Sequence, residues 1–192
     1  MKVLMAAKNV TALFALTAST GALAGGDAAT KPAGNEAIIR VGQDAVSLYL
    51  EPQATATNSA QLGLIYNDDD DITVLNGGLF ANGDRQEIKG RLGGKFFYAN
   101  LDGDSGYGVA LGGEATVVLN SDISITGGLF LSPSSLSFSE VDGYEEWYVK
   151  ARFQLFENGA VAAGVGSFQL EPERGRDFEL DDGLFLEMIL KY

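Results

Sequence analysis

The sequence contains neither cysteine nor histidine among its 192 residues. Without cysteine the chain can form no disulfide, thiolate nucleophile or cysteine-ligated metal site. Without histidine it lacks the commonest general base, the Ser-His-Asp triad and every histidine-ligated zinc site. Proline is scarce at 4 residues whereas glycine is frequent at 25, so the chain is not a proline-rich coil. We expect no catalytic residue, no cofactor and no enzymatic activity.

The sequence also lacks an apolar run of the about 20 residues that a membrane-spanning helix needs. The N-terminus instead has the pattern of a secretory signal peptide, in which two lysines precede a short apolar segment at residues 10–18 and small residues lead to Ala24. We predict a signal peptide over residues 1–24, cut after Ala24, and a disordered leader over residues 25–35. Because no cysteine follows the cut, a lipoprotein anchor is excluded.

Acidic residues outnumber basic residues by 26 to 13, which gives a formal net charge of −13. Removal of the two lysines of the signal peptide leaves 11 basic against 26 acidic residues, or −15. So acidic a chain repels nucleic acid, which we exclude as a partner.

The remaining chain alternates apolar with polar residues, which is the period of a β-strand. In the segment 145–156, Trp147 and Val149 face one way, whereas Lys150 and Arg152 face the other. We predict an all-β fold of ten strands, with eight as the fallback, because a barrel with both termini on one side needs an even number. The predicted strands are Glu36–Gly42, Ala45–Glu51, Gln61–Asn67, Ile72–Ala81, Glu87–Ala99, Tyr107–Asn120, Ile123–Leu131, Glu145–Phe156, Ala160–Leu170 and Leu184–Tyr192.

Two kinds of barrel fit this alternation. In a soluble barrel the apolar face points inward, whereas in an outer-membrane barrel it meets lipid and the charged face lines the interior. Several strands reach the about 9–11 residues that a tilted membrane strand needs. Aromatic side chains lie on the apolar face near strand ends, where a membrane barrel has its interface girdles. These aromatic residues are Tyr66, Tyr98, Tyr107, Trp147 and Tyr192.

Connection lengths favour the membrane barrel as well. Asn120-Ser121 and Asn158-Gly159 are tight turns, whereas Ser132–Tyr144 and Glu171–Gly183 are long connections. Short periplasmic turns against longer outer loops are typical of outer-membrane barrels. We therefore predict a single antiparallel, up-and-down transmembrane β-barrel over residues 36–192, a monomer in the outer membrane of a Gram-negative bacterium. The alternative is a soluble, lipocalin-like periplasmic barrel that binds an apolar ligand.

Five segments resemble the YfaZ family of small bacterial outer-membrane proteins, in matching order across about Gln61 to Phe156. They are Asn67-Asp68-Asp69-Asp70-Asp71, Asp102-Gly103-Asp104-Ser105-Gly106-Tyr107, Gly112-Gly113, Leu131-Ser132-Pro133-Ser134-Ser135-Leu136 and Gly143-Tyr144-Glu145-Glu146. The resemblance implies an outer-membrane, porin-like barrel and no catalytic residues. The last strand, ending on Tyr192, also resembles the C-terminal signal that such proteins present to the barrel-insertion machinery.

Acidic residues gather in the connections expected outside the membrane. A concentrated anionic rim could bind divalent cations weakly through oxygen ligands and so bridge to lipopolysaccharide phosphates. The alternative is a solvated acidic surface. The candidate cation ligands are Asp68, Asp69, Asp70, Asp71, Asp102 and Asp104; the rim also holds Glu140, Asp142, Glu171, Glu173, Asp177, Asp181 and Asp182.

Charges of both signs are expected on the inward face of the barrel. In so narrow a lumen they should form a salt-bridged plug, with a narrow polar conduit as the alternative. The predicted lumen network is Glu87, Lys89, Arg91, Lys95, Glu114, Glu146, Lys150, Arg152, Glu187 and Lys191. The sequence thus predicts a structural or narrow, porin-like transport barrel. A hydrolase using carboxylates and serine is disfavoured, because no spacing selects a carboxylate pair.

Overall fold

The computed structural model describes residues 35–52, 55, 57–85, 87–101, 104–172 and 178–192. The predicted signal peptide and all of the predicted leader except Asn35 lie outside them. The strands are β1 (Glu36–Val41), β2 (Ala45–Glu51), β3 (Asn58–Asn67), β4 (Ile72–Arg85), β5 (Ile88–Leu101), β6 (Asp104–Val118), β7 (Ile123–Ser132), β8 (Ser137–Ser139), β9 (Val141–Phe156), β10 (Gly159–Pro172) and β11 (Phe178–Lys191). In this part of the chain, no helix is both long and apolar enough to cross a bilayer.

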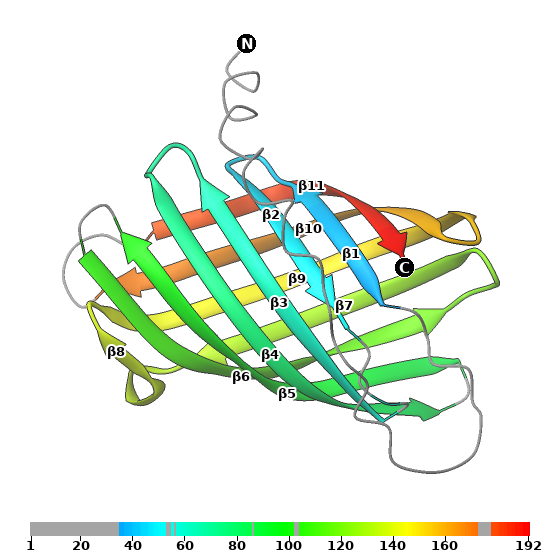
Figure 1. The fold of residues 1–192 in the computed structure, drawn as a ribbon, viewed down its shortest axis with the longest axis horizontal. Helices are drawn as coiled ribbons and strands as arrows, with labels where there is room; N and C mark the ends of the chain where they lie inside the picture. The colour runs from blue at the N-terminus through cyan, green and yellow to red at the C-terminus, as the bar shows by residue number, and fades with distance from the viewer. Residues whose placement is uncertain (1–34, 53–54, 56, 86, 102–103, 173–177) are drawn as a thin grey trace. The chain divides into compact units, whose positions relative to one another are not determined.

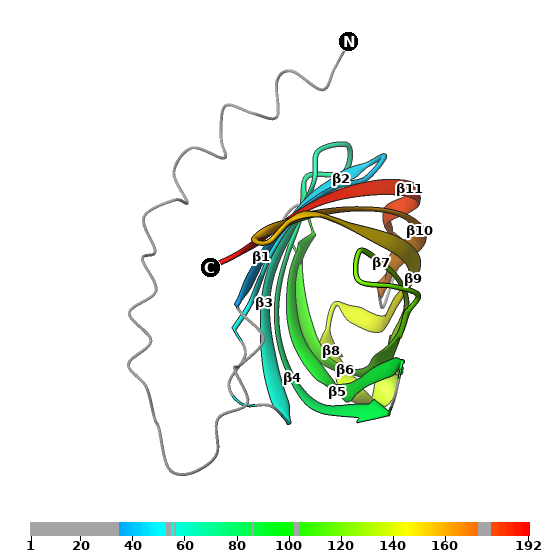
Figure 2. The same cartoon turned by 90° about the vertical axis from the view of Figure 1, so that its right-hand side faces the viewer.

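The strands close into an antiparallel ring (Figures 1 and 2). The first and last strands, β1 and β11, pair with each other along all of β1, which joins the two ends of the sheet. The short strand β8 is not a strand of the ring, because it pairs only with the part of β6 that lies beyond the end of the β6–β7 pairing. The other ten strands form the ring, so the prediction of an all-β, closed antiparallel barrel of ten strands is confirmed and the eight-stranded fallback is wrong.

The barrel has two different ends. The terminal end carries the start of β1, the end of β11 and tight turns; there the backbone N–H of Tyr192 donates to the carbonyl of Asn35 at 3.0 Å. In the β6–β7 turn the side-chain oxygen of Asn120 accepts hydrogen bonds from the backbone of Asp122 and Ile123, at 2.9 and 2.8 Å. The loop end carries the connections β1–β2, β3–β4, β5–β6, β7–β9 and β10–β11.

The connections at the loop end differ from the prediction in extent. Strand β10 runs to Pro172 and β11 begins at Phe178, so the predicted long connection Glu171–Gly183 is mostly strand. Strand β9 likewise begins at Val141, inside the predicted connection Ser132–Tyr144. On β11 the alternation changes phase at Leu180, because Phe168 of β10 pairs with Asp181 and Gln169 pairs with Glu179, which leaves Leu180 as a bulge.

Large apolar side chains point away from the barrel interior along most of each strand. Leu79 on β4 and Leu92 on β5 are 74% and 72% exposed, whereas Lys95, on the opposite face of β5, is 1% exposed. A soluble protein buries such residues, so the faces of this barrel are reversed with respect to a soluble one.

The interior at the loop end is apolar. Tyr144 of β9 stacks on Phe97 of β5, with ring centroids 4.7 Å apart, and contacts Phe168 of β10 at 4.9 Å. Aliphatic side chains fill the space around these rings. We call this group the apolar plug; it comprises Phe97, Ala99, Leu101, Val141, Tyr144, Phe168, Leu170 and Leu180, none of them more than 7% exposed. The alternation predicted charges on the inward face and gave no sign of this plug.

A pair of glycines bends the wall sharply between β4 and β7. Gly93 of β5 lies opposite Gly112 of β6, and a Cβ atom on Gly112 would lie 2.0 Å from the carbonyl oxygen of Leu129 on β7. Because neither glycine has a side chain, Phe80 and Phe130 of the flanking strands meet edge-to-face with centroids 5.9 Å apart. Glycine at such a corner provides the curvature that closes a small barrel.

Substitution of Gly112 by alanine should destabilise the barrel, because the new methyl group meets neighbouring backbone and not a movable side chain. We expect a loss of about 1–3 kcal/mol. The matched control is Gly127→Ala, where the nearest atom to the new Cβ is 3.8 Å away. The readout is the temperature at which the folded, faster-migrating form disappears on a gel. Equal temperatures for the two variants would contradict the role of the corner.

Candidate functional site

The terminal half of the interior is filled by charged side chains. Six ion pairs occur among the described residues, and all of them lie inside the barrel. They join five basic side chains (Arg40, Arg91, Lys95, Lys150, Arg152) to five acidic ones (Glu36, Glu51, Glu114, Glu146, Glu187). We call these ten residues the lumen network.

Arg91 of β5 connects strands on two sides of the barrel. It donates two hydrogen bonds to Glu114 on the neighbouring β6, both 2.6 Å long. Two more, of 3.1 and 3.0 Å, reach across the interior to Glu51 on β2. Bidentate pairs of this kind fix direction as well as distance, so Arg91 holds β2 and β6 at a set separation.

Lys95 lies four residues beyond Arg91 on β5, toward the loop end, and pairs with Glu146 of β9 at 2.8 Å. The hydroxyl of Tyr144 donates to the same carboxylate oxygen at 2.5 Å, so this pair adjoins the apolar plug. The ammonium group also lies 3.8 Å from the ring centroid of Phe130. A buried pair is tolerated only when its remaining hydrogen-bonding capacity is used, and these neighbours contribute to that.

Glu187 of β11 receives two cations, Arg40 of β1 and Lys150 of β9, each at 2.8 Å. The guanidinium carbon of Arg40 lies 4.3 Å from the ring centroid of Phe185 and 5.1 Å from that of Tyr148. Aromatic faces thus replace the water that a charged group loses on burial.

Nearer the terminal end, Arg152 of β9 donates to both carboxylate oxygens of Glu36 on β1, at 3.0 and 2.8 Å. Lys191 donates to the side-chain oxygen of Gln154 at 3.3 Å. These contacts cross the interior between strands that are not neighbours in the ring. Side-chain contacts therefore bridge the lumen at several levels along the barrel axis.

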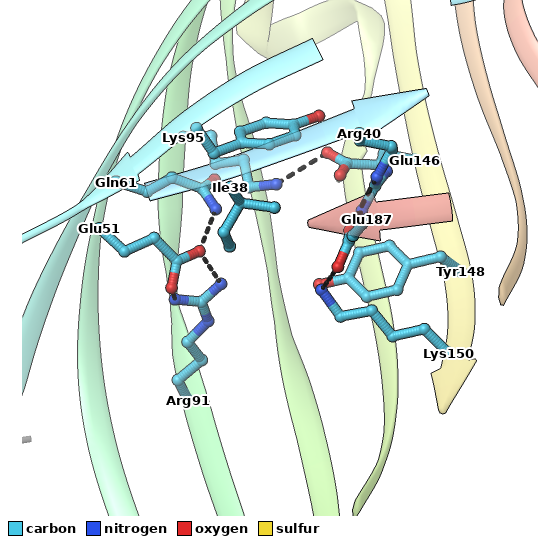
Figure 3. A pocket seen from close by; sticks show the side chains of 11 residues that line it. Ile38, Arg40, Glu51, Gln61, Arg91, Lys95, Glu146, Tyr148, Lys150 and Glu187 are labelled. Carbon is cyan, nitrogen blue, oxygen red and sulfur yellow. Dashed lines mark hydrogen bonds and ion pairs between the residues drawn. The ribbon is translucent and has the colours of Figure 1, made fainter. Parts of the chain in front are cut away.

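A small cavity of about 10 Å³ lies within the lumen network (Figure 3), which is room for about one water molecule. The amide nitrogen of Gln61 donates to Glu51 at 2.6 Å beside this cavity. The amide oxygen of Gln61 is buried and has no hydrogen-bond donor among the described residues. The lining residues are Ile38, Arg40, Tyr49, Glu51, Gln61, Arg91, Lys95, Glu146, Tyr148, Lys150 and Glu187.

The structure brings together most, but not all, of the residues predicted for the lumen. Glu87 and Lys89 are exposed at the terminal end and belong to none of the ion pairs of the described chain. They fall outside the lumen network because they lie beyond Arg91, the residue of β5 nearest the terminal end that makes a cross-barrel ion pair. The predicted residues inside the barrel are Arg91, Lys95, Glu114, Glu146, Lys150, Arg152, Glu187 and Lys191.

Sequence reasoning missed three members of the network, Glu36, Arg40 and Glu51. They lie on the two shortest strands of the ring, where few residues are available to establish an alternation. The alternation could nevertheless have identified Glu51, which lies on the strand face opposite the outward residues Leu48 and Leu50. Arg152 is related to Phe153 in the same way.

Among the described residues, the candidate cation ligands at the loop end are not gathered into a group that could hold a metal ion. Within the described ranges, no three acidic side chains lie close enough to hold a metal ion, and Asp102 lies outside those ranges. Asp68 and Asp71 instead accept hydrogen bonds from the hydroxyl of Tyr66, both at 3.3 Å. Asp69, Asp70 and Asp104 take no part in a described ion pair. A weak divalent-cation site here stays a prediction.

The arrangement is suited to closing a lumen and not to acid–base chemistry. Each carboxylate of the lumen network is held by a cation, and the cavity has room for little more than water. Fold and site together define a small, closed β-barrel with an apolar exterior and a charge-paired interior.

The chain belongs to the YfaZ family: the family model described as "YfaZ precursor" matches residues 14–192. No curated protein matches the chain. Among solved structures, it is similar to the outer membrane channel DcaP of Acinetobacter baumannii, with a TM-score of 0.43 and 12% identity over 87% of this chain. The chain spans about half of that channel, 56% of its length. It is also similar to the NanC porin, with a TM-score of 0.44 and 8% identity, over 82% of this chain and 98% of the porin.

Substitution of Lys95 by methionine should destabilise the barrel strongly, because Glu146 would then be buried without a cation. Breaking a buried pair in this way costs about 3–5 kcal/mol. The double variant Lys95→Met/Glu146→Gln removes the stranded charge and should regain most of the loss. Lys89→Met is the control, with an expected effect within about 0.5 kcal/mol. Urea unfolding in detergent measures all three; a double variant no more stable than Lys95→Met would show that the loss does not come from the stranded charge of Glu146.

Proposed function

We propose that this protein is an integral barrel of the bacterial outer membrane with a charged, mostly closed lumen, which serves as a structural element or a narrow, porin-like path. The observation that carries this proposal is the apolar exterior of a ring with no free sheet edge. In lipid every backbone polar group must be satisfied within the protein, and a closed barrel does so. An apolar surface of this extent on a soluble monomer would promote aggregation.

The height of the apolar exterior fits a bilayer. On β5 the outward apolar residues run from Ile88 to Tyr98, which is 11 residues, and on β9 from Trp147 to Leu155, which is 9. A tilted transmembrane strand needs about 9–11 residues. Outward aromatic residues mark the loop-end limit of this belt, where Tyr98 lies opposite Tyr107 and Tyr107 stacks on Phe138 at 5.5 Å. An aromatic girdle is expected at that level.

Above this girdle the outward residues become polar. On β9 the exposed residue next to Trp147 toward the loop end is Glu145, and on β11 Glu179 is exposed at the corresponding end. The acidic loop end therefore faces the outside of the cell, where divalent cations would link it to lipopolysaccharide phosphates. The last strand, ending at Tyr192, would be recognised by the barrel-insertion machinery, and the barrel would act as a monomer.

A soluble, lipocalin-like barrel is less well supported. Such a barrel would need an apolar cavity for its ligand, whereas here the cavity is lined by charged and polar groups and the apolar plug is tightly packed. It would also leave Leu79, Leu92 and Leu111 exposed to water, at 74%, 72% and 55%.

Trp147 is the sole tryptophan of the chain, lies outward on β9 and is 39% exposed, so its fluorescence tests the membrane belt directly. In vesicles of brominated lipid we expect strong quenching, greatest with bromines near the headgroups. In the control Trp147→Phe/Ala151→Trp, quenching should be greatest with bromines deeper in the acyl chains, because Ala151 lies midway along the outward residues of β9 that run from Trp147 to Leu155. Absence of quenching, together with a monodisperse chain without detergent, would falsify the proposal and favour the soluble barrel.

The closed lumen predicts little ion conduction. Incorporated into a planar bilayer, the wild-type barrel should give no steady open-channel current, because the apolar plug seals the loop end of the interior and cross-barrel ion pairs span the terminal half. Correct insertion is checked in the same preparation by the gel shift on heating. Steady currents from every inserted wild-type barrel would instead show that the lumen network opens readily. They would favour a narrow polar conduit over a closed, salt-bridged lumen.

A further inference from the structure

Among the inward charged side chains, solvent exposure is greatest at the terminal end, although Glu187, between two cations, is 1% exposed. The inward side chains of Lys95 and Glu146 are 1% and 5% exposed, those of Arg91 and Glu51 are 15% and 19%, and Arg152 reaches 23%. All of these residues point into the lumen, so the exposed area faces the interior and not the lipid. The interior is therefore open from the terminal end up to the level of Arg91, and it closes at Lys95.

Beyond Lys95 the apolar plug excludes solvent. On β5 the next inward residues are Phe97 and Ala99, both 0% exposed, and Val141 and Leu170 on the opposite wall are also 0% exposed. Tyr144 of β9 joins the two sides of this seal by stacking on Phe97 of β5, and its hydroxyl donates to Glu146 of its own strand. An opening at one end and a packed core at the other make a blind vestibule.

The cavity lies at the closed end of this vestibule, and it contains an unused hydrogen-bond acceptor. Gln61 is 5% exposed, and its amide oxygen has no donor among the described residues, whereas its amide nitrogen is held by Glu51. Leaving such an acceptor unpaired in a buried position costs about 1–3 kcal/mol. The cavity beside it is large enough for one water molecule.

Charge decides which occupant fits. Four cations line the cavity, Arg40, Arg91, Lys95 and Lys150, so a further cation would be repelled. Three carboxylates offset three of these cations, and an anion beside Gln61 would face the amide oxygen, an acceptor that repels it. Water is neutral, donates to the oxygen of Gln61 and accepts from the ammonium group of Lys95. Buried waters typically make about three hydrogen bonds of this kind.

We propose that the terminal half of the lumen is a blind, water-filled vestibule sealed by the apolar plug, and that Gln61 holds a bound water molecule at its closed end. The lumen is then one-sided, which means that water enters it from the terminal end and cannot pass the apolar plug. That the open end faces the periplasm rests on the proposed function; the one-sided lumen itself rests only on the interior geometry.

Because the chain has no native cysteine, single cysteines report accessibility without background. Ser124→Cys places a thiol inside the vestibule opposite Arg152, whereas Ala110→Cys and Ala99→Cys place thiols at the seal and in the plug. In the refolded full-length mature barrel, a small charged methanethiosulfonate reagent should modify Ser124→Cys about tenfold faster or more, since thiol reactivity follows exposure. Each rate is divided by that of the same variant in denaturant, which removes the effect of the nearby arginine on the thiol.

Ala115→Cys, an exposed outward position on β6, separates the two proposals. In vesicles this thiol should be protected by lipid while Ser124→Cys still reacts. Rapid modification of Ala115→Cys would overturn the membrane proposal and leave the vestibule intact. Equal rates at Ser124→Cys and Ala99→Cys in a barrel that passes the heating gel test would overturn the vestibule.

The bound water is tested by a crystal structure of the refolded barrel. We expect electron density for one water molecule within hydrogen-bonding distance of the amide oxygen of Gln61. A halide or metal ion at that position in crystals grown with bromide or rubidium, detected by anomalous scattering, would overturn the assignment of water. So would a rotated Gln61 whose oxygen is satisfied by a protein donor.

Discussion

The pairing of β1 with β11 is the constraint on which the rest of the structure depends. Once the first and last strands pair, the ring has no free edge, and every strand exchanges its backbone hydrogen bonds with two neighbours. Only then can the outer surface be apolar without exposing backbone polar groups to an apolar surrounding. Closure of ten strands also fixes a narrow interior, in which charged side chains have no room to remain solvated separately. The cross-barrel pairs of Arg91, Lys95 and Arg152 follow from that confinement.

The interior changes character at the level where the exterior does. Below the aromatic girdle, outward residues such as Leu92 are apolar and inward residues such as Arg91 are charged. Above it, β11 places Glu179 outside and Leu180 inside, which is the pattern of a soluble barrel. Each half thus presents to its surroundings the kind of surface that those surroundings stabilise. The loop-end half has a core of the ordinary kind, and the terminal half depends on ion pairs instead.

The sequence predicted the strands and their faces because alternation is a local property that a charged strand such as β9 displays over many residues. It predicted neither the apolar plug nor the full lumen network, because both depend on which strands face each other across the ring. Phe97 follows Lys95 on the same face, and nothing local shows that Tyr144 and Phe168 complete a seal there. Glu36 and Glu51 were missed because their strands are short. The bulge at Leu180 hid the extension of β11 for a similar reason, since an extra residue shifts the period of the alternation by one.

The distribution of charge bears on what the lumen can do. The lumen network pairs five cations with five anions, so the acidic excess of the chain lies outside it. A permanently charged pore selects ions by the sign of its lining, but a balanced interior offers no such preference. Opening it would require several cross-barrel pairs to separate and Tyr144 to leave both Phe97 and Glu146, which are coupled changes at opposite walls. Because charge neutrality and packing act together, the network holds the walls of the barrel at fixed distances. A path through it would need movement of whole strands, not rotation of a single side chain.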